Sequence, residues 1–373
     1  MATVELSGEF ITAPVASYAR LRAQAPVHRA ITPEGTEVWL VTRYADVRAA
    51  LEDPRLSVDA AHAADACALD PAGPAPDLLG TDPPLHTRLR GCAAQALRVH
   101  HLRPRVAEIA AGLVDEFAAA GSAELVGDYA RPLSAAVLAD LLGVPAAQRP
   151  EFRDRAGGPA EPLQQHLAEL IAAKRAHPGD DLISALLAQD ELSGDEVLAL
   201  TFRIVSAGHQ KATDLLGNGL AALLQHPEQL ATLHADPPLL ERTAIDELLR
   251  FDPPQQAAIR RFPLSEVDIG GVVVPAGATV LLSLMSAHHD PAAFADPEAL
   301  DITRDDNPHL AFGRGPHFCL GAQLAQMQAE LGIGTILRRL PDLAATEPPE
   351  HLRRRQSWRH RGLVELPVAF RPR

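Results

Sequence analysis

Apolar residues recur at three- and four-residue spacing along most of the chain, which is the period of an amphipathic helix. The pattern predicts at least nine helices, over 85–99, 105–119, 132–142, 163–174, 181–189, 195–224, 227–234, 239–251 and 320–340. Alternating β-rich residues predict a strand beginning at Val38, followed by a helix from Ala45 to Leu51. Two β-branched runs within 266–284, separated by Pro-Ala-Gly, predict a hairpin. The expected fold class is mainly α with small β-sheets.

The chain shows no internal repeat and no linker long enough to divide it. The stretch 66–84 is rich in Pro and Gly, and we interpret it as a mobile loop rather than a domain boundary. The 373 residues, 1–373, are therefore expected to form a single domain.

Composition narrows the classes of protein to consider. With 47% hydrophobic and 22% charged residues, the chain has the composition of a folded protein. Its formal net charge of −14 argues against general affinity for nucleic acid or anionic membranes. No apolar run approaches the roughly 18 residues of a membrane span, and a Glu precedes any Lys or Arg at the start of the sequence. We expect a cytoplasmic protein.

Three widely spaced cysteines, Cys67, Cys92 and Cys319, form no CxxC pair, so neither a disulfide framework nor a structural zinc site is indicated. A reducing compartment is expected.

The segment 309–326 carries the most informative chemistry. Gly313, Gly315 and Gly321 permit tight turns and the close approach of a flat molecule, and Cys319 directly precedes a predicted helix. Backbone N–H groups at a helix start favour a thiolate over a thiol, and a thiolate in an apolar loop suits haem iron. The alternatives are a buried structural cysteine, or a zinc ion that also recruits His309 and His317.

The run FGRGPHFCLG resembles the cysteine-loop signature of the cytochrome P450 family. It matches at every fixed position, namely Phe312, Gly313, Gly315, His317, Cys319 and Gly321. The resemblance implies a triangular helical domain around a buried haem b (iron protoporphyrin IX). It makes Cys319 the proximal iron ligand, places Phe312 beside the sulfur, and lets His317 reach a haem propionate.

Further motifs extend this resemblance over roughly residues 15–370. Glu247 and Arg250 share one helix face at i, i+3 and are expected to form a buried structural ion pair, although a solvated pair would have the same spacing. His86 and Arg90, four residues apart, suit propionate oxygens, with an ordinary solvated face as the alternative. By resemblance Arg261 binds a propionate too, although Arg260 could substitute.

The segment 205–224 resembles the family's distal helix through Ala207 and Gly208 but departs at the next positions. Most members carry an acid and then a hydroxyl residue that deliver protons to bound dioxygen, whereas this chain has Gln210 and Lys211. Thr213 cannot simply replace the hydroxyl, because two residues along a helix rotate a side chain by about 200°. We consider both a tolerated variant of an ordinary hydroxylase and a Lys211 that pairs with a substrate carboxylate, a propionate or the iron.

The segment 150–180 departs as well. Family members place two sizeable helices here as a lid, whereas this chain offers one good helix, 162–175, after a short segment broken at 157–159. A short lid would suit a bulky or tethered substrate.

Three functions are weighed. The first is monooxygenation of a secondary-metabolite-type small molecule with dioxygen and electrons from a ferredoxin and ferredoxin reductase. The second is oxidative aromatic coupling of a peptide or carrier-bound substrate. The third is a catalytically silent haem protein that binds a partner. Arginines expected on the cysteine-loop side could steer an acidic ferredoxin, and a monomer is expected; these arginines are Arg88, Arg98, Arg103, Arg105, Arg314 and Arg338.

Overall fold

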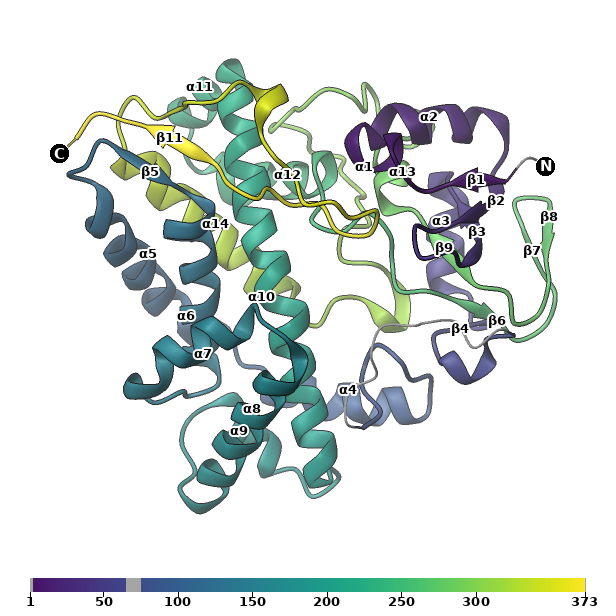
Figure 1. Cartoon of the computed structure of the whole chain (residues 1–373), viewed down its shortest axis with the longest axis horizontal. Helices are drawn as coiled ribbons and strands as arrows, with labels where there is room; N and C mark the ends of the chain where they lie inside the picture. Colours follow the sequence, from purple (N-terminus) through teal and green to yellow (C-terminus); the bar gives the residue numbers. More distant parts are fainter. Residues whose placement is uncertain (1–2, 65–74, 373) are drawn as a thin grey trace.

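The protein is built around one long helix, α10 (Gly194–Gln225), in a computed structural model that describes residues 3–64 and 75–372 (Figure 1). Ser193 begins this helix through a capping box with Glu196, which satisfies two backbone N–H groups of the first turn. The helix ends at His226, and Pro227 begins α11 (Pro227–Ala235). Proline is well placed there, because the first helical residue needs no N–H donor.

All nine predicted helices are confirmed, with boundaries that shift by a few residues. Beside α10 and α11 they are α4 (Leu85–Ala96), α5 (Arg103–Phe117), α6 (Arg131–Leu141), α8 (Ala160–Ala176), α9 (Leu182–Leu187), α12 (Ile245–Phe251) and α14 (Ala322–Arg339). The pattern did not reveal α1 (Glu9–Thr12), α2 (Pro14–Gln24), α7 (Arg149–Ala156) and α13 (Leu284–His288), and α3 (Tyr44–Glu52) matches the predicted helix at 45–51. The mainly α expectation is confirmed.

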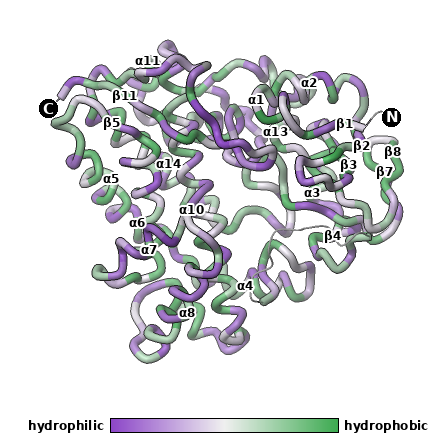
Figure 2. Tube along the Cα trace, in the orientation of Figure 1, coloured by the Kyte–Doolittle hydropathy of each residue, from purple (hydrophilic) through white to green (hydrophobic). Residues whose placement is uncertain are grey.

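The largest core cluster lies where α4, α5, α6, α10 and α14 pack together. Gly332 allows this packing, since a Cβ added there would lie 2.6 Å from Leu216 Cδ2 on α10 and 3.0 Å from Leu133 Cδ2 on α6. Tyr129 fixes the same contact by donating from Oη to the Gly332 carbonyl at 2.8 Å. Hydrophobic and hydrophilic residues are interspersed along these helices, as expected for helices with one buried face (Figure 2).

Small sheets lie around the helices. The largest has the order β1-β2-β3-β9, from β1 (Val4–Glu5), β2 (Val27–Ile31), β3 (Glu37–Val41) and β9 (Val280–Leu282). The β1–β2 and β3–β9 pairs are parallel, and the central β2–β3 pair is antiparallel. Two others join β10 (Ala344–Ala345), β11 (Pro367–Ala369) and β5 (Ser122–Glu124), and β4 (Leu56–Ser57) with β6 (Phe262–Pro263). The strand predicted at Val38 is confirmed as β3.

The predicted hairpin within 266–284 was placed at the wrong turn. The antiparallel pair is β7 (Val267–Ile269) with β8 (Val272–Val274), and its turn is Gly270-Gly271 rather than Pro-Ala-Gly. Both glycines have positive φ, 58° and 85°, which a tight two-residue hairpin turn requires. The second β-branched run becomes β9, which leaves the hairpin and pairs with β3.

The loop interpretation of 66–84 is tested only in part. Its described portion, 75–84, contains neither helix nor strand, while 66–74, including Cys67, lies outside the described residues. Among the residues that are described, no helix is both long and apolar enough to cross a membrane.

Candidate functional site

The segment between residues 309 and 321 folds back on itself and presents Cys319 directly before α14. Cys319 N donates to Phe312 O at 2.8 Å, and Gly313 N donates to Leu310 O at 2.8 Å. Gly313 and Gly315 have φ near 70°, where other residues are strained. A Cβ on Gly315 would also lie 3.2 Å from Leu51 O, so this loop conformation requires glycine.

The Cys319 side chain is exposed, yet protein surrounds it closely enough for desolvation to raise the pKa of its thiol. A backbone N–H of Gly321 and the charges of Lys211 and Arg90 oppose that shift without reversing it. The backbone N–H of Gly321 at the helix start acts in the direction expected for a thiolate, while burial has the larger effect on the thiol. Cys92, the other described cysteine, is buried, and both are free of disulfides.

His86, His317 and Arg261, three of the residues predicted to bind propionates, lie together, and the charge of the fourth, Arg90, acts on His86. The rings of His86 and His317 have centroids 4.2 Å apart. Arg261 is 2% exposed, and its charge acts on His317, while the charge of Arg90 acts on both His86 and Cys319. Desolvation is the main cause that lowers the pKa of His317 to about 4 and that of Arg261 to about 10.

This cluster contains polar atoms without a partner, although the Asp82 carboxylate lies 3.9 Å from His317 Nε2. His86 Nε2 and His317 Nδ1 are buried with no hydrogen-bond partner, and Arg261 donates to the backbone carbonyls of residues 259 and 260. Within the described part of the chain, no carboxylate lies within ion-pair distance of Arg261 or Arg90. A buried guanidinium with no matching carboxylate, beside two unpartnered imidazole nitrogens, fits an anionic ligand such as the propionates of haem.

The zinc alternative gains no support. His309 is held by Asp246, with 3.4 Å between Nε2 and Oδ1, and its Nδ1 accepts from Ala311 N at 3.2 Å. Over residues 3–64 and 75–372, no three His, Cys, Asp or Glu side chains are grouped as a metal site.

On α10, Ala207 and Gly208 lie in regular helix, and Gln210 donates from Nε2 to Asp214 Oδ1 at 3.0 Å. Asp214 also forms an ion pair with Arg355, and desolvation still raises its pKa to about 6. The Thr213 hydroxyl donates to His209 O of its own helix at 3.0 Å. Thr213 and Asp214 are therefore both engaged by neighbouring groups of the protein.

Lys211 is half-buried, and desolvation lowers its pKa. The positive charges of Arg359 and Arg203 lower it further, while Asp214 and Cys319 act in the opposite direction. Because Lys211 and Cys319 influence each other, the unusual lysine on α10 and the cysteine loop face the same region of the molecule.

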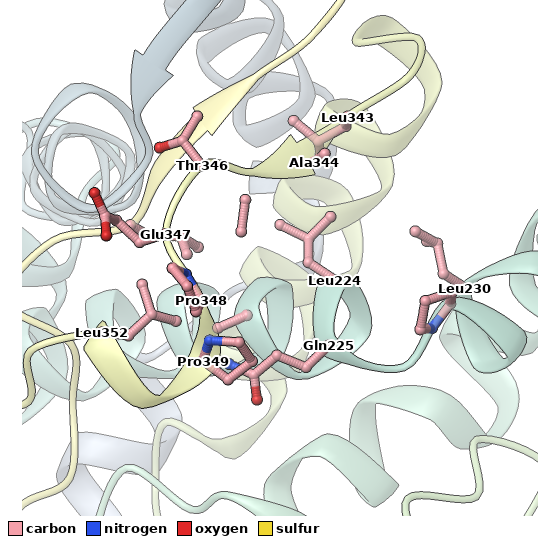
Figure 3. Close-up of a pocket in the computed structure, with 14 residues that line it drawn as sticks. Leu224, Gln225, Leu230, Leu343, Ala344, Thr346, Glu347, Pro348, Pro349 and Leu352 are labelled. Carbon is pink, nitrogen blue, oxygen red and sulfur yellow. The ribbon is translucent and has the colours of Figure 1, made fainter.

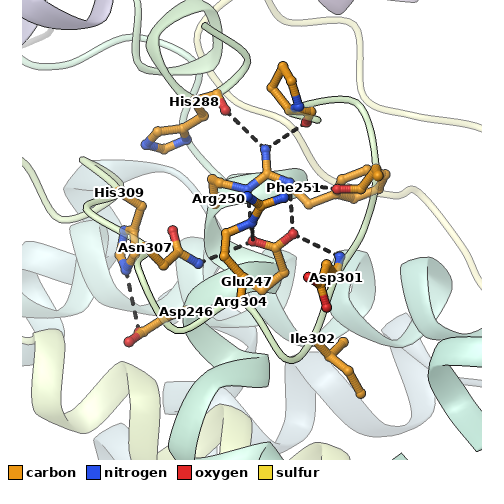
Figure 4. Close-up of polar contacts among 12 residues, drawn as sticks. Asp246, Glu247, Arg250, Phe251, His288, Asp301, Ile302, Arg304, Asn307 and His309 are labelled. Atoms are coloured by element: carbon orange, nitrogen blue, oxygen red, sulfur yellow. Dashed lines mark hydrogen bonds and ion pairs between the residues drawn. The ribbon is translucent and has the colours of Figure 1, made fainter. Parts of the chain in front are cut away.

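Glu247 and Arg250 form the predicted buried pair at the centre of a larger network (Figure 4). Both side chains are fully buried, with two contacts of 2.8 Å between carboxylate and guanidinium. Glu247 also accepts from the backbone N–H of Asp301, from Arg304 and from Asn307. The network ties α12 to the segment that leads into the cysteine loop.

Residues 150–180 form one long helix after a short one, as the sequence predicted. Helix α7 has 8 residues, and three residues connect it to α8. A Cβ on Gly157 in this connection would lie 3.3 Å from His209 Nε2, so the connection packs directly on α10 just before Gln210 and Lys211.

Sequence analysis missed the role of residues 352–362, which we call the C-terminal strap and which cross α10 (Figure 1). Arg355 holds Asp214, Asn218 Nδ2 donates to Arg361 O at 2.9 Å, and Arg359 lies near Lys211. The signal was a dense run of basic residues, since five arginines occur within 353–361. Figure 2 shows hydrophilic residues along this part of the chain.

A separate pocket of about 550 Å³ lies at the C-terminal end of α10 (Figure 3). Its lining comes from α10, α11 and the segment 343–352, and includes Leu224, Leu230, Thr346, Pro348 and Leu352. None of the predicted site residues lines it.

Comparison with known proteins gives a consistent result. The family model described as Cytochrome P450 matches residues 160–349. Cytochrome P450 monooxygenase PikC of Streptomyces venezuelae is 43% identical over 98% of this chain and 93% of its own length. The 6-deoxyerythronolide B hydroxylase of Saccharopolyspora erythraea is 37% identical over 94% of this chain and 95% of its own length.

Among solved structures, that of P450BioI in complex with hexadec-9Z-enoic acid ligated Acyl Carrier Protein superposes with a TM-score of 0.87 and 31% identity. The match covers 98% of this chain and 100% of that one. The likeness therefore includes both the helical half and the sheets, and it leaves no large part of the chain unmatched.

Proposed function

The chain belongs to the cytochrome P450 family, and on that premise we propose that it is a haem-thiolate monooxygenase acting on a secondary-metabolite-type small molecule. The observation that carries the proposal is Cys319 at the end of a glycine-shaped loop, next to a cluster of unmatched donors. When bound, haem supplies the activation of dioxygen. The predicted fold, mainly α with small sheets around a haem site, agrees with the family.

We assign the haem site to residues of this chain that fit it. Cys319 would be the proximal ligand in a loop shaped by Phe312, Gly313 and Gly321. The propionates of haem b would be held by His86, Arg90, Arg261 and His317. The unpartnered nitrogens of His86 and His317 support this assignment, since a buried polar atom without a partner is costly.

The distal side would be formed by Ala207, Gly208, Gln210 and Lys211 on α10. Because Gln210 is bonded to Asp214 and Thr213 to its own helix, none of these groups offers the usual acid and hydroxyl. Protons would then come from water or from the substrate itself.

We further propose that the enzyme is a cytoplasmic monomer, one domain over 1–373, that receives electrons from a ferredoxin and its reductase. Four arginines expected to steer that partner form ion pairs within the chain: Arg88 with Glu196, Arg103 with Glu330, Arg105 with Asp140 and Arg314 with Glu52. These pairs reduce the charge available for steering, so contact near the exposed Phe318 would contribute more than long-range attraction.

The second candidate is oxidative coupling of a peptide or carrier-bound substrate. The 8-residue α7 and its three-residue connection to α8 support it, because a short lid would suit a bulky or tethered substrate. Products distinguish the two candidates: monooxygenation adds one oxygen to the substrate mass, whereas coupling removes two hydrogens.

The test of the main proposal is the spectrum of the reduced protein with carbon monoxide. We expect the red-shifted Soret band of a thiolate-ligated haem, and we expect Cys319→Ala to abolish it while Cys92→Ala keeps it. A Cys319→Ala protein that retains the band would refute the assignment. A wild-type protein that shows the band but never oxidises a substrate with reductase present would favour the silent haem-protein alternative.

A further inference from the structure

We propose that Lys211 binds an anionic group of the substrate, a carboxylate, and thereby selects acidic substrates. The inference rests on the proposed function and names the class of substrate for the same site. Three observations support it: the small number of lysines in the chain, the contacts of Asp214, and the charged groups near Lys211.

Lysine is rare in this protein, so its occurrence on α10 is not a matter of general composition. Of 34 basic residues other than histidine, only Lys174 and Lys211 are lysines. Lys174 is paired with Asp181, at 2.6 Å from Nζ to Oδ2. In the described part of the chain, no carboxylate lies within ion-pair distance of Lys211 Nζ, although its side chain is half-buried.

The nearest candidate partner, Asp214, is already satisfied by other donors. Gln210 donates to Oδ1, and Arg355 forms an ion pair through Oδ2. Gly362 leaves room for the same carboxylate, since a Cβ there would lie 2.0 Å from Oδ1. The C-terminal strap thus holds Asp214 in place and leaves Lys211 without a carboxylate of its own.

Two arginines lie near Lys211 and lower its pKa. Arg359 approaches from the C-terminal strap and Arg203 from two turns earlier on α10, and both act on Lys211. Arg203 is balanced by Asp77. Cys319 is the other group that raises the pKa of Lys211, and a Cys319 that ligates iron would not be available to pair with it.

A partly desolvated ammonium without a partner is costly, and a carboxylate brought by the substrate would offset that cost. The available anion is therefore one that arrives in the region above the cysteine loop, where a substrate is oxidised.

The experiment compares acids with their neutral esters on the haem-loaded protein at neutral pH. The probes are dodecanoate and 5-phenylpentanoate, each against its methyl ester, titrated by the spin-state change of the Soret band. The variants are Lys211→Met, Lys211→Arg and, as the matched control for loss of a lysine, Lys174→Met. The spectrum of the reduced protein with carbon monoxide is recorded first for every protein.

We expect the wild type and Lys174→Met to bind at least one acid roughly tenfold to a hundredfold more tightly than its ester, the range of a charge-assisted hydrogen bond. Lys211→Met should lose that preference, and Lys211→Arg should keep part of it. Wild-type protein that binds neither acid more tightly than its ester overturns the proposal without any variant. An equal preference in Lys211→Met overturns it as well.

Two further outcomes separate the failures. If the resting Soret band of Lys211→Met shifts as expected for loss of a nitrogen ligand, Lys211 contacts iron and the inference is wrong. If the wild type lacks the thiolate band with carbon monoxide, the proposed function itself fails. A normal band without discrimination between acid and ester refutes the inference alone.

Discussion

Replacing Glu247 by Ala should prevent stable folding, because the change leaves a fully buried guanidinium without its counterion. The Glu247 carboxylate receives two hydrogen bonds from Arg250, at 2.8 Å each, and three more from Asp301 N, Arg304 and Asn307 (Figure 4). Arg250 keeps only three backbone carbonyls, those of residues 288, 297 and 299. These carbonyls satisfy its donors but supply no negative charge.

The magnitude follows from this geometry. Breaking a buried ion pair by removing one partner costs about 3–5 kcal/mol. The other three donors also lose their acceptor, at about 1–3 kcal/mol for each that stays buried and unpaired. Since a typical protein is stable by about 5–15 kcal/mol, the free energy of unfolding should fall close to zero. Glu247→Gln should be less severe, because the amide keeps one acceptor oxygen.

The assay is denaturant unfolding with haem content measured on the soluble fraction. The matched control is Glu241→Ala on the preceding helical turn, whose side chain is 69% exposed and lies 4.0 Å from Arg103. The control should change the free energy of unfolding by less than about 0.5 kcal/mol. A Glu247→Ala protein with wild-type stability and full haem content, but without turnover, would refute the structural role and indicate a catalytic one.

Two further predictions concern packing and pH. Gly91→Ala on α4 should raise the free energy of unfolding by about 0.5–1 kcal/mol, because nothing lies within 4 Å of the added Cβ. Gly332→Ala should lower it by about 1–3 kcal/mol, because the added Cβ would contact Leu216. Chemical denaturation measures both changes, and equal effects would contradict the packing at α14. Desolvation lowers the pKa of His209 to about 4. As the pH falls, the unfolded chain therefore takes up a proton at this residue before the folded chain does. The free energy of unfolding of the wild type should fall by up to about 3 kcal/mol between about pH 6.5 and pH 4. His209→Asn should remove that part of the pH dependence, with exposed His234→Asn as the control, and parallel pH profiles for all three proteins would show that His209 is not buried as described.

The sequence was sufficient for most helices because their apolar period is long and regular. It failed where a short element depends on tertiary contacts. The run Val280–Leu282 is apolar like Val272–Val274, and only its parallel pairing with β3 shows that it belongs to another sheet. Gly270-Gly271 was the available signal for the true turn, since consecutive glycines suit two positive φ angles.

The part of the site that lies in one contiguous motif could be predicted from the sequence. Residues 312–321 identify the cysteine loop without any structure, whereas the C-terminal strap is distant in sequence from α10. Its contribution depends on Arg355 reaching Asp214 and on Gly362 leaving room for that carboxylate. No spacing rule relates residues 141 positions apart, so the isolation of Lys211 from Asp214 becomes visible only in the folded chain.

The same spacing can also carry opposite meanings, as two i, i+3 pairs in this protein demonstrate. Arg105 and Glu108 on α5 lie 2.9 Å apart with side chains 48% and 67% exposed, whereas Glu247 and Arg250 are fully buried. In water the first pair contributes little, because solvent screens it. The second pair is costly to separate, and its remaining acceptor capacity binds Asp301, Arg304 and Asn307. Because Asn307 lies two residues before the cysteine loop begins at His309, the buried pair fixes where that loop starts, and Cys319 depends on it without touching it.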